Sequence, residues 1–267
     1  MSNARKPSRD SYYSTPVERA LRVLSVCADG RASVTLSEIS RDLKLNKTSS
    51  FRFANTLVRL GYLQRDAHTR QLRLGLKAFA LGQDLVQNFD LIQIIRPMVD
   101  EAFQKYQCSM DVALRDGDVL LVVYRKEAHD TLIFHSPTVM RDLHATALGK
   151  AVLAHLERGD LAQFLSKRRL IPRTKATLTT QALLLADLRR TRERGYSLNN
   201  EESIAGLIAV GAPLMSSSPG GAIGAISFDF AKVQCSLRSL ERDYAKAVVQ
   251  LAKDISQLMP VGAARTF

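Results

Sequence analysis

Apolar residues recur every three or four positions in three segments between residues 15 and 60, a spacing that predicts three helices. The expected N-caps are Thr15, Thr35 and Asn46, and each of the two threonines is followed three residues later by the glutamate of a capping box. The apolar stripes expected to be buried are Val17, Ala20, Leu21 and Leu24 in the first helix, Leu36, Ile39 and Leu43 in the second, and Phe53, Leu57 and Leu60 in the third.

After the third helix, Gly61 predicts a helix end, and the segments YLQRD and RQLRLG predict two short strands joined by a turn at residues 67–69. The pattern then becomes helical again, with apolar residues three or four apart over residues 76–95. We interpret residues 15–75 as one domain, residues 76–95 as a linker helix, and residues 1–14 as a disordered basic tail.

Residues 96–260 predict a larger α+β domain. A helix beginning at Pro97 is followed by the strands MDVALR and DVLLVVYRK, which flank the turn signal Asp116-Gly117, and by the strand TLIFHS. Helices are expected over 145–157, 160–166, 180–194 and 236–258, and strands over LIAVGAPLM and AIGAISFDF. Hairpins mixed with helices favour a largely antiparallel sheet over a doubly wound one.

Charge separates the two parts of the chain. The net charge is +12, and residues 1–80 carry 15 basic and 6 acidic residues, whereas the rest carries 23 and 20. A small basic segment next to a nearly neutral one indicates a polyanion-binding domain attached to another module, although a merely basic surface is the alternative. The chain has no long apolar run, its polar start lacks a signal-peptide core, and its three cysteines form no CxxC pair, so we expect a soluble cytoplasmic protein without membrane contact.

The third predicted helix, with the short helix before it, has the helix-turn-helix arrangement. Such a helix fits the major groove of DNA, where Arg, Ser and Thr side chains contact bases or phosphates, and a basic wing contacts the backbone. Any two-helix corner with a solvated outer face gives a similar pattern, so the wing and the charge asymmetry carry much of the prediction. The candidate DNA-binding residues are Lys47, Thr48, Ser49 and Arg52 on the helix, and Arg65, Arg70 and Arg73 on the wing.

Catalytic and metal-binding signatures are missing from the sequence, which contains no GxSxG, no complete phosphate loop and no HExxH. His144 and His155 are interpreted as packing or capping residues, and Glu201-Glu202 as a solvated or capping pair rather than an acid/base element. We therefore expect no enzymatic activity, no metal and no cofactor.

Two segments of the larger domain indicate a binding site. In RDLHATALGKAVLAHL, small residues lie at a helix start, where free N–H groups favour a carboxylate, although close helix packing also needs small residues. Alternation in AIGAISFDF places Ser227 and Asp229 on one face of a strand, but periodicity leaves open whether that face lines a pocket or meets solvent.

Several motifs, in order along the chain, resemble the isocitrate-lyase-regulator (IclR) family of transcription factors. They are VERALRVLSV, LSEISRDLKLNKTSSFRFANTLVRLGYLQRD, RLGLKAFALG, LHATALGKAVLA, RGYSLNNEESIAGLIAVGAPL and AIGAISF. The resemblance covers about residues 15–258 and implies a winged helix-turn-helix domain, a linker helix and a GAF-like effector domain that binds a small organic acid, often a carboxylate or aromatic acid. It also implies dimers through the DNA-binding domains, or tetramers, that bind a double-stranded operator.

The resemblance also implies an effector site, in which the backbone at Ala147 and Leu148 binds the effector carboxylate. The rest of the implied lining is Asn199, Leu207, Ala209, Ser227 and Asp229. Asp229 is a departure, because a buried aspartate repels a carboxylate unless it is protonated or paired, and this argues against a glyoxylate- or pyruvate-like ligand.

Together these features predict a ligand-responsive DNA-binding regulator, a repressor or an activator of catabolic genes. Two alternatives remain at this point: a hydrolase or transferase with a basic accessory domain, and a nucleoid protein that binds DNA without sequence preference.

Overall fold

The computed structural model describes residues 12–28, 32–88, 90–131, 134, 137–216 and 221–259. The chain divides into two compact units, residues 1–88 and 89–267. Each unit has a hydrophobic core of its own. Most of the expected basic tail, residues 1–11, lies outside the described residues.

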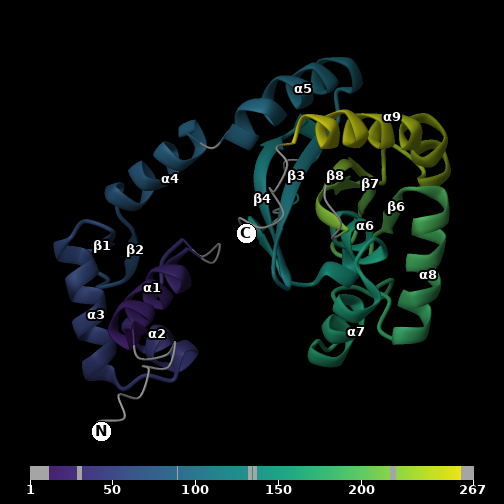
Figure 1. Ribbon diagram of the computed structural model, residues 1–267. Helices are drawn as coiled ribbons and strands as arrows, with labels where there is room; N and C mark the ends of the chain where they lie inside the picture. Colours follow the sequence, from purple (N-terminus) through teal and green to yellow (C-terminus); the bar gives the residue numbers. More distant parts are fainter. Residues whose placement is uncertain are drawn as a thin grey trace, which may run out of the picture. The chain divides into compact units, whose positions relative to one another are not determined.

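The first unit consists of three helices, a two-stranded sheet and a fourth helix (Figure 1). Its elements are α1 (Thr15–Cys27), α2 (Leu36–Leu43), α3 (Lys47–Arg59), β1 (Leu63–Arg65), β2 (Leu72–Leu74) and α4 (Leu76–Asn88). The capping box at Thr35 and the Asn46 cap are confirmed, because both side chains accept the expected backbone hydrogen bonds. The Thr15 cap is wrong: α1 begins one residue earlier than expected, with Ser14 at its N-cap and no side-chain hydrogen bond there.

The core of this unit is smaller than the sequence pattern predicts. Leu57 is buried as expected, but α1 buries Val23 and Cys27 while Val17 and Leu21 are more than half exposed. Leu60 is also largely exposed, because α3 turns Ser50, Ala54 and Leu57 toward the core. An apolar stripe is therefore left uncovered within the unit.

The second unit is built on a six-stranded sheet flanked by helices. Its elements are α5 (Asp90–Tyr106), β3 (Ser109–Asp116), β4 (Val119–Lys126), the 3-10 turn η2 (His129–Thr131), β5 (Val139–Met140), the 3-10 turn η3 (Leu143–Ala145), α6 (Ala147–Ala154), α7 (Arg158–Lys167), α8 (Gln181–Arg194), β6 (Ser197–Asn200), β7 (Leu207–Met215), β8 (Ala222–Ala231) and α9 (Leu237–Leu258). The strand order is β5-β4-β3-β8-β7-β6, with all neighbours antiparallel, so the expected α+β fold with an antiparallel sheet is confirmed.

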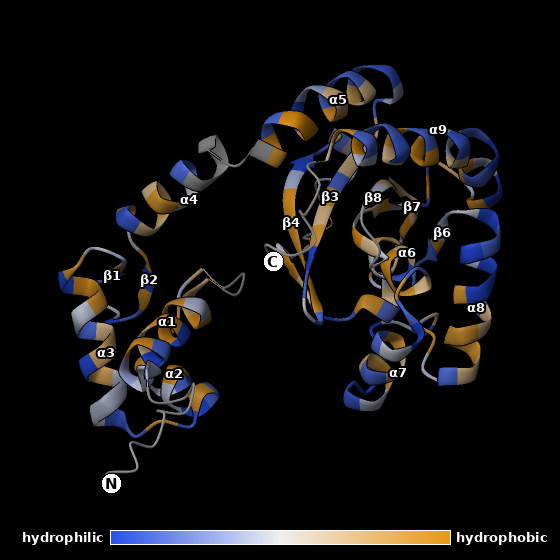
Figure 2. Cartoon of the chain, viewed as in Figure 1, coloured by the Kyte–Doolittle hydropathy of each residue, from blue (hydrophilic) through white to orange (hydrophobic). Residues whose placement is uncertain are grey.

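The two faces of this sheet carry different residues. One face is apolar, with Met110, Ile208 and Phe228 among its buried residues, and α5 and α9 pack on it. The helices α6, α7 and α8 lie on the other side of the sheet, where their buried residues pack against β3, β4 and β8. In Figure 2 the strands of the sheet are mostly hydrophobic, whereas α8 and α9 carry many hydrophilic residues as well.

Two expectations about local structure differ from what is observed. The helix expected over 76–95 is instead two described helices, and α5 passes through Pro97 rather than starting there. The reason is that Leu91, Ile95 and Val99 continue one buried stripe across the proline, so their burial outweighs the backbone hydrogen bond that proline removes. Four of the six residues of TLIFHS lie outside the described residues, and its first residue belongs to η2.

Candidate functional site

The first candidate surface is the outer face of α3. The turn between α2 and α3 is possible because Lys44 adopts a left-handed conformation (φ 53°), and Asn46 then accepts a hydrogen bond from the Ser49 N–H at 2.7 Å. Lys47, Thr48 and Arg52 are exposed, while Ser49 is half-buried. Among the described residues, no ion pair involves Lys47 or Arg52, so both cations are available to an anionic partner.

The wing is a tight turn between β1 and β2. Asp66 closes it by accepting hydrogen bonds from the N–H groups of His68 and Thr69 and from the Thr69 hydroxyl, and these bonds lower the pKa of Asp66. Arg70, with φ 60°, follows the turn and is exposed, as is Arg73. The guanidinium of Arg65 instead stacks over the ring of Phe51 on α3, 5.4 Å from its centroid, and so joins the wing to the helix.

The second candidate site lies on the sheet face opposite the α5 and α9 core. Strand register places Asp229 directly beside Ala209 and Ser109, and Ser227 directly beside Gly211 and Asp111. Since side chains alternate along a strand, these residues share a face. Ser227 and Asp229 therefore lie on the face away from the apolar core, where Asp229 lines a cavity and Ser227 is buried beside it.

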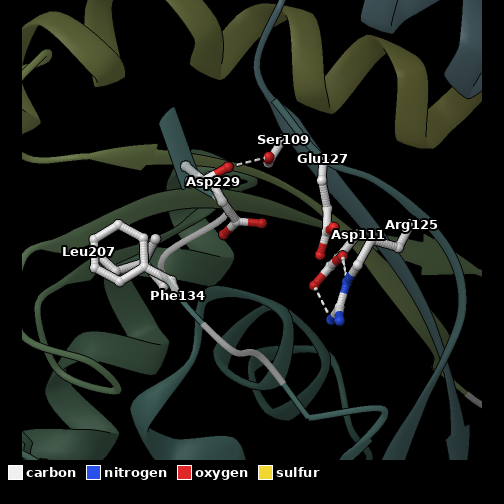
Figure 3. Close-up of a pocket in the computed structure, with 8 residues that line it drawn as sticks. Ser109, Asp111, Arg125, Glu127, Phe134, Leu207 and Asp229 are labelled. Carbon is white, nitrogen blue, oxygen red and sulfur yellow. Dashed lines mark hydrogen bonds and ion pairs between the residues drawn. The ribbon is translucent and has the colours of Figure 1, made fainter. Parts of the chain in front are cut away.

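The cavity has a volume of about 20 Å³, which is enough for one water-sized group. Figure 3 shows the Asp229 carboxyl group pointing into it, with Phe134 and Leu207 on one side and Glu127 on another. The residues that line it are Ser109, Asp111, Arg125, Glu127, Thr131, Phe134, Leu207 and Asp229.

Most charge in the cavity is negative. Arg125 donates two hydrogen bonds to Asp111, from Nε at 2.6 Å and from Nη2 at 2.8 Å, so one cation is matched to one carboxylate. Asp229 keeps some exposure because it faces the cavity, yet protein atoms surround it otherwise. Burial, together with the nearby negative charge of Asp111, raises the pKa of Asp229 to about 8, although the Ser227 hydroxyl donates a hydrogen bond to it at 2.9 Å.

The helix start implied by the family resemblance lies next to this cavity but does not line it. Ala147 packs directly over Gly211, where a Cβ would come within 3.0 Å of the Ala147 carbonyl carbon, and Ser197 donates a hydrogen bond to the Ala147 oxygen at 2.6 Å. Leu148 is buried. Thus, of the seven implied effector residues, the cavity lining contains Leu207 and Asp229, and Ser227 bonds to Asp229.

Asn199 and Ala209 are neighbours in the sheet register, and both are buried. The Asn199 amide donates a hydrogen bond to Ser203 at 2.8 Å and accepts one from the Glu202 N–H at 2.8 Å. Asn199 therefore holds the turn after β6.

The histidine and glutamate candidates have structural partners, and Glu202 is buried rather than solvated as expected. Lys150 is buried, and its Nζ lies 2.7 Å from Glu202 Oε1 and 3.0 Å from Asp187 Oδ2. Glu201 pairs with Lys232 and accepts a hydrogen bond from the Gly206 N–H at 2.8 Å. The His144 ring bonds the Ile171 carbonyl at 3.1 Å, and burial lowers its pKa.

Six lining residues were not predicted, and these are Ser109, Asp111, Arg125, Glu127, Thr131 and Phe134. The segment SMDVALR contains a usable signal, because Ser109 and Asp111 alternate with the apolar Met110 and Val112. Arg125 carries no comparable signal, since its position opposite Asp111 depends on the register of the hairpin.

A larger cavity, of about 490 Å³, lies between α9 and β7 and is lined in part by Arg192, Pro213, Met215 and Lys253. None of its lining residues is a predicted effector residue, so the smaller polar cavity is the better candidate. Among the described residues, no group of three His, Cys, Asp or Glu side chains is placed to hold a metal ion. No described helix is long and apolar enough to cross a membrane.

A winged helix-turn-helix unit joined to an α+β unit with a small polar cavity defines a class, the DNA-binding regulators that carry a ligand-binding domain. Comparison with known proteins gives the family. The model for the bacterial transcriptional regulator IclR C-terminal domain matches residues 83–257, and the IclR helix-turn-helix model matches residues 16–67. The chain belongs to the IclR family of ligand-responsive, DNA-binding transcriptional regulators of catabolic pathways.

Relatives along nearly the whole chain are regulators. The chain is 30% identical over 250 residues to the HTH-type transcriptional regulator BhcR of Paracoccus denitrificans (strain Pd 1222), covering 93% of this chain and 88% of that protein. It is 27% identical over 260 residues to the HTH-type transcriptional regulator KdgR of Escherichia coli (strain K12), covering 97% of each.

Solved structures show the same fold. An IclR family transcriptional regulator from Brucella abortus matches with a TM-score of 0.79 at 22% identity, over 97% of each chain. An IclR homolog from Microbacterium hydrocarbonoxydans, complexed with 4-hydroxybenzoate, matches with a TM-score of 0.71 at 22% identity, over 91% of this chain and 98% of that one.

Proposed function

We propose that the chain binds a specific DNA operator through α3 and the wing, and that a small molecule bound in the second unit's polar cavity controls this binding. The observation that carries the proposal is the presence, in one chain, of an exposed cationic helix-turn-helix face and a small polar cavity. Action on DNA also implies a cytoplasmic protein, and neither site calls for a catalytic role.

The proposed DNA contacts fall into two groups. Side chains of α3 enter the major groove and read bases, with Arg52 as the main reader, and arginines of the wing neutralise phosphates. The proposed contacts are Lys47, Thr48, Ser49 and Arg52 for the helix, and Arg65, Arg70 and Arg73 for the wing. The proposed effector site consists of the cavity lining with Ser227, and the remaining effector residues proposed from the family resemblance are Ala147, Leu148, Asn199 and Ala209.

We further propose that two copies associate through their first units, as a dimer or within a tetramer. The support is the exposure of large apolar side chains on two helices of this unit. They are Val17 and Leu21 on α1, and Leu76 and Phe79 on α4, where Leu76 is 85% exposed and Phe79 is 64% exposed. Pairing would also match two recognition helices to two half-sites. A Phe79→Glu variant is expected to sediment as a smaller species than the wild type, and an unchanged species would remove this surface from the interface.

Selection of genomic DNA fragments by the purified full-length protein, followed by sequencing, tests the proposed function. Enrichment of a short, palindrome-like site is expected for the wild type and for the control Arg169→Ala, which changes an exposed arginine of the second unit. The Arg52→Ala variant is expected to lose that enrichment. Equal recovery of all fragments by the wild type would contradict a sequence-specific regulator and favour a nucleoid protein.

A further inference from the structure

The charges that face the cavity indicate what kind of ligand it accepts. Three carboxyl groups line it, from Asp111, Glu127 and Asp229, against one guanidinium group from Arg125. That guanidinium is held in a two-bond pair with Asp111, so the pair contributes little net charge. The remaining charge is negative whether or not Asp229 is ionised, and an anionic group entering this cavity would be repelled.

The hydrogen bonding of Asp229 also favours a cationic ligand. Its carboxyl group points into the cavity (Figure 3), and among the described residues Ser227 is its one hydrogen-bond donor, at Oδ2. The charged groups that face it are Asp111 from β3, Arg125 from β4 and Glu127 just after β4, and η2 adds a hydroxyl group from Thr131. A partly buried carboxyl group with an open oxygen favours a ligand that donates hydrogen bonds and carries positive charge.

The size and lining of the cavity favour an ammonium group over a metal ion. About 20 Å³ fits an ammonium group, which has nearly the size of water. Among the described residues the carboxyl groups are not grouped as a metal site would need. Phe134 and Leu207 give one apolar wall for the carbon atoms next to such a group.

We propose that the effector of this chain carries a protonated amino group, as a small amine or an amino acid does, and that the Asp229 carboxyl group binds it. This inference rests on the proposed function, in which the cavity is the effector site. It assigns Asp229, a residue at which the chain departs from a simple carboxylate-binding pocket, to the recognition of ligand nitrogen. Glu127 adds a second negative charge to the cavity lining. The pairing of Arg125 with Asp111 holds the guanidinium group, so it does not compete with the ligand's ammonium group for Asp229.

The test compares ligands that differ in one atom. Calorimetric titrations of the full-length protein at neutral pH and fixed ionic strength would use glycine against glycolate, L-alanine against L-lactate, and ethanolamine against ethylene glycol, each at up to millimolar concentrations. At least one nitrogen-bearing member is expected to bind more tightly than its oxygen counterpart. A response to the amino acids but not to ethanolamine would identify an amino acid, and the reverse would identify a simple amine.

Two variants locate the binding. Asp229→Asn removes the negative charge that Asp229 carries once an ammonium group is bound, while keeping an acceptor for the Ser227 hydroxyl. It is expected to weaken binding roughly 10- to 100-fold, as loss of one hydrogen bond to a charged group does. The matched control Asp243→Asn changes an exposed carboxylate of α9 and is expected to leave the affinity unchanged.

Three results would overturn the proposal: an acid without nitrogen that binds as tightly as its amino counterpart, an Asp229→Asn variant that keeps full affinity, or no binding by any nitrogen-bearing member. None of these affects the selection of DNA fragments, which tests the regulator function separately.

Discussion

The buried cluster around Lys150 gives a prediction of large magnitude. The Lys150 side chain is 1% exposed, and its two carboxylate partners, Glu202 and Asp187, have side chains 9% and 13% exposed. Lys150→Met keeps the length of the side chain but removes its charge, and it leaves two carboxylates close together in a buried place. Breaking a buried ion pair from one side costs about 3–5 kcal/mol, so the free energy of unfolding of the second unit is expected to fall by that amount.

The matched control is Arg173→Met. Arg173 pairs with Asp142, but its side chain is 50% exposed, and an exposed pair contributes about 0–1 kcal/mol. Urea unfolding followed by circular dichroism gives both free energies. In a thermal scan, a unit of this size loses about 2–4 °C per kcal/mol, so Lys150→Met is expected to lower the Tm by roughly 6–20 °C.

The pH dependence of this loss is a second readout. Burial raises the pKa of Glu202, whereas the positive charge of Lys150 lowers it. Without Lys150, the folded protein therefore binds a proton at Glu202 more readily than the unfolded chain does. The loss caused by Lys150→Met is therefore largest at neutral pH and shrinks as the pH falls and Glu202 becomes protonated. A loss no larger than that of Arg173→Met, or one independent of pH, would refute the reasoning.

Four further outcomes are expected. Arg52→Ala is expected to reduce discrimination between operator and unrelated DNA by about 1–3 kcal/mol, measured by fluorescence anisotropy, and equal weakening on both DNAs would make it a phosphate contact. Arg70→Ala and Arg73→Ala are each expected to weaken binding to all DNA and to reduce the slope of log affinity against log salt by about one phosphate, and an unchanged slope would exclude the wing from the interface. The pKa of Asp229 is about 8 in the empty cavity, so binding of an ammonium group requires loss of the Asp229 proton. The affinity for the amine, measured by calorimetry, is therefore expected to rise by about tenfold per pH unit up to that pKa and then to level off. A carboxylate ligand that accepts a hydrogen bond from protonated Asp229 would show the opposite slope. Gly149→Ala is expected to destabilise the second unit in urea unfolding, because the added Cβ would lie 2.1 Å from a backbone oxygen of η3, and a variant as stable as the wild type would contradict this close packing.

Features that depend on neighbouring residues were predictable from the sequence. The Thr35 capping box, the Asn46 cap and the wing turn form from contacts within a few residues, and the structure has all three. The predicted burial of Val17 and Leu21 in α1 is wrong, because both residues follow the helical period but lie outside the core of the unit. A helical period indicates that a face is apolar, and it does not indicate what covers that face.

The cavity was only partly predictable, for a related reason. Alternation placed Ser227 and Asp229 on one face, but the direction of that face depends on which helices cover the sheet. The pairing of Asp111 with Arg125 depends on hairpin register, and that of Lys150 with Glu202 joins residues 52 positions apart. Such contacts arise only when the chain folds, so local sequence patterns do not contain them.

The central claim is that occupancy of the cavity controls DNA binding, and one titration tests it most directly. The affinity of the full-length protein for its selected operator would be measured by fluorescence anisotropy without ligand and with the cavity saturated, with saturation confirmed by calorimetry under the same conditions. A clear change in operator affinity is expected for the wild type, and no change is expected for Asp229→Asn at a ligand concentration that leaves its cavity empty. An operator affinity that stays the same at full saturation would contradict the claim, because a ligand that binds without shifting DNA affinity is not an effector.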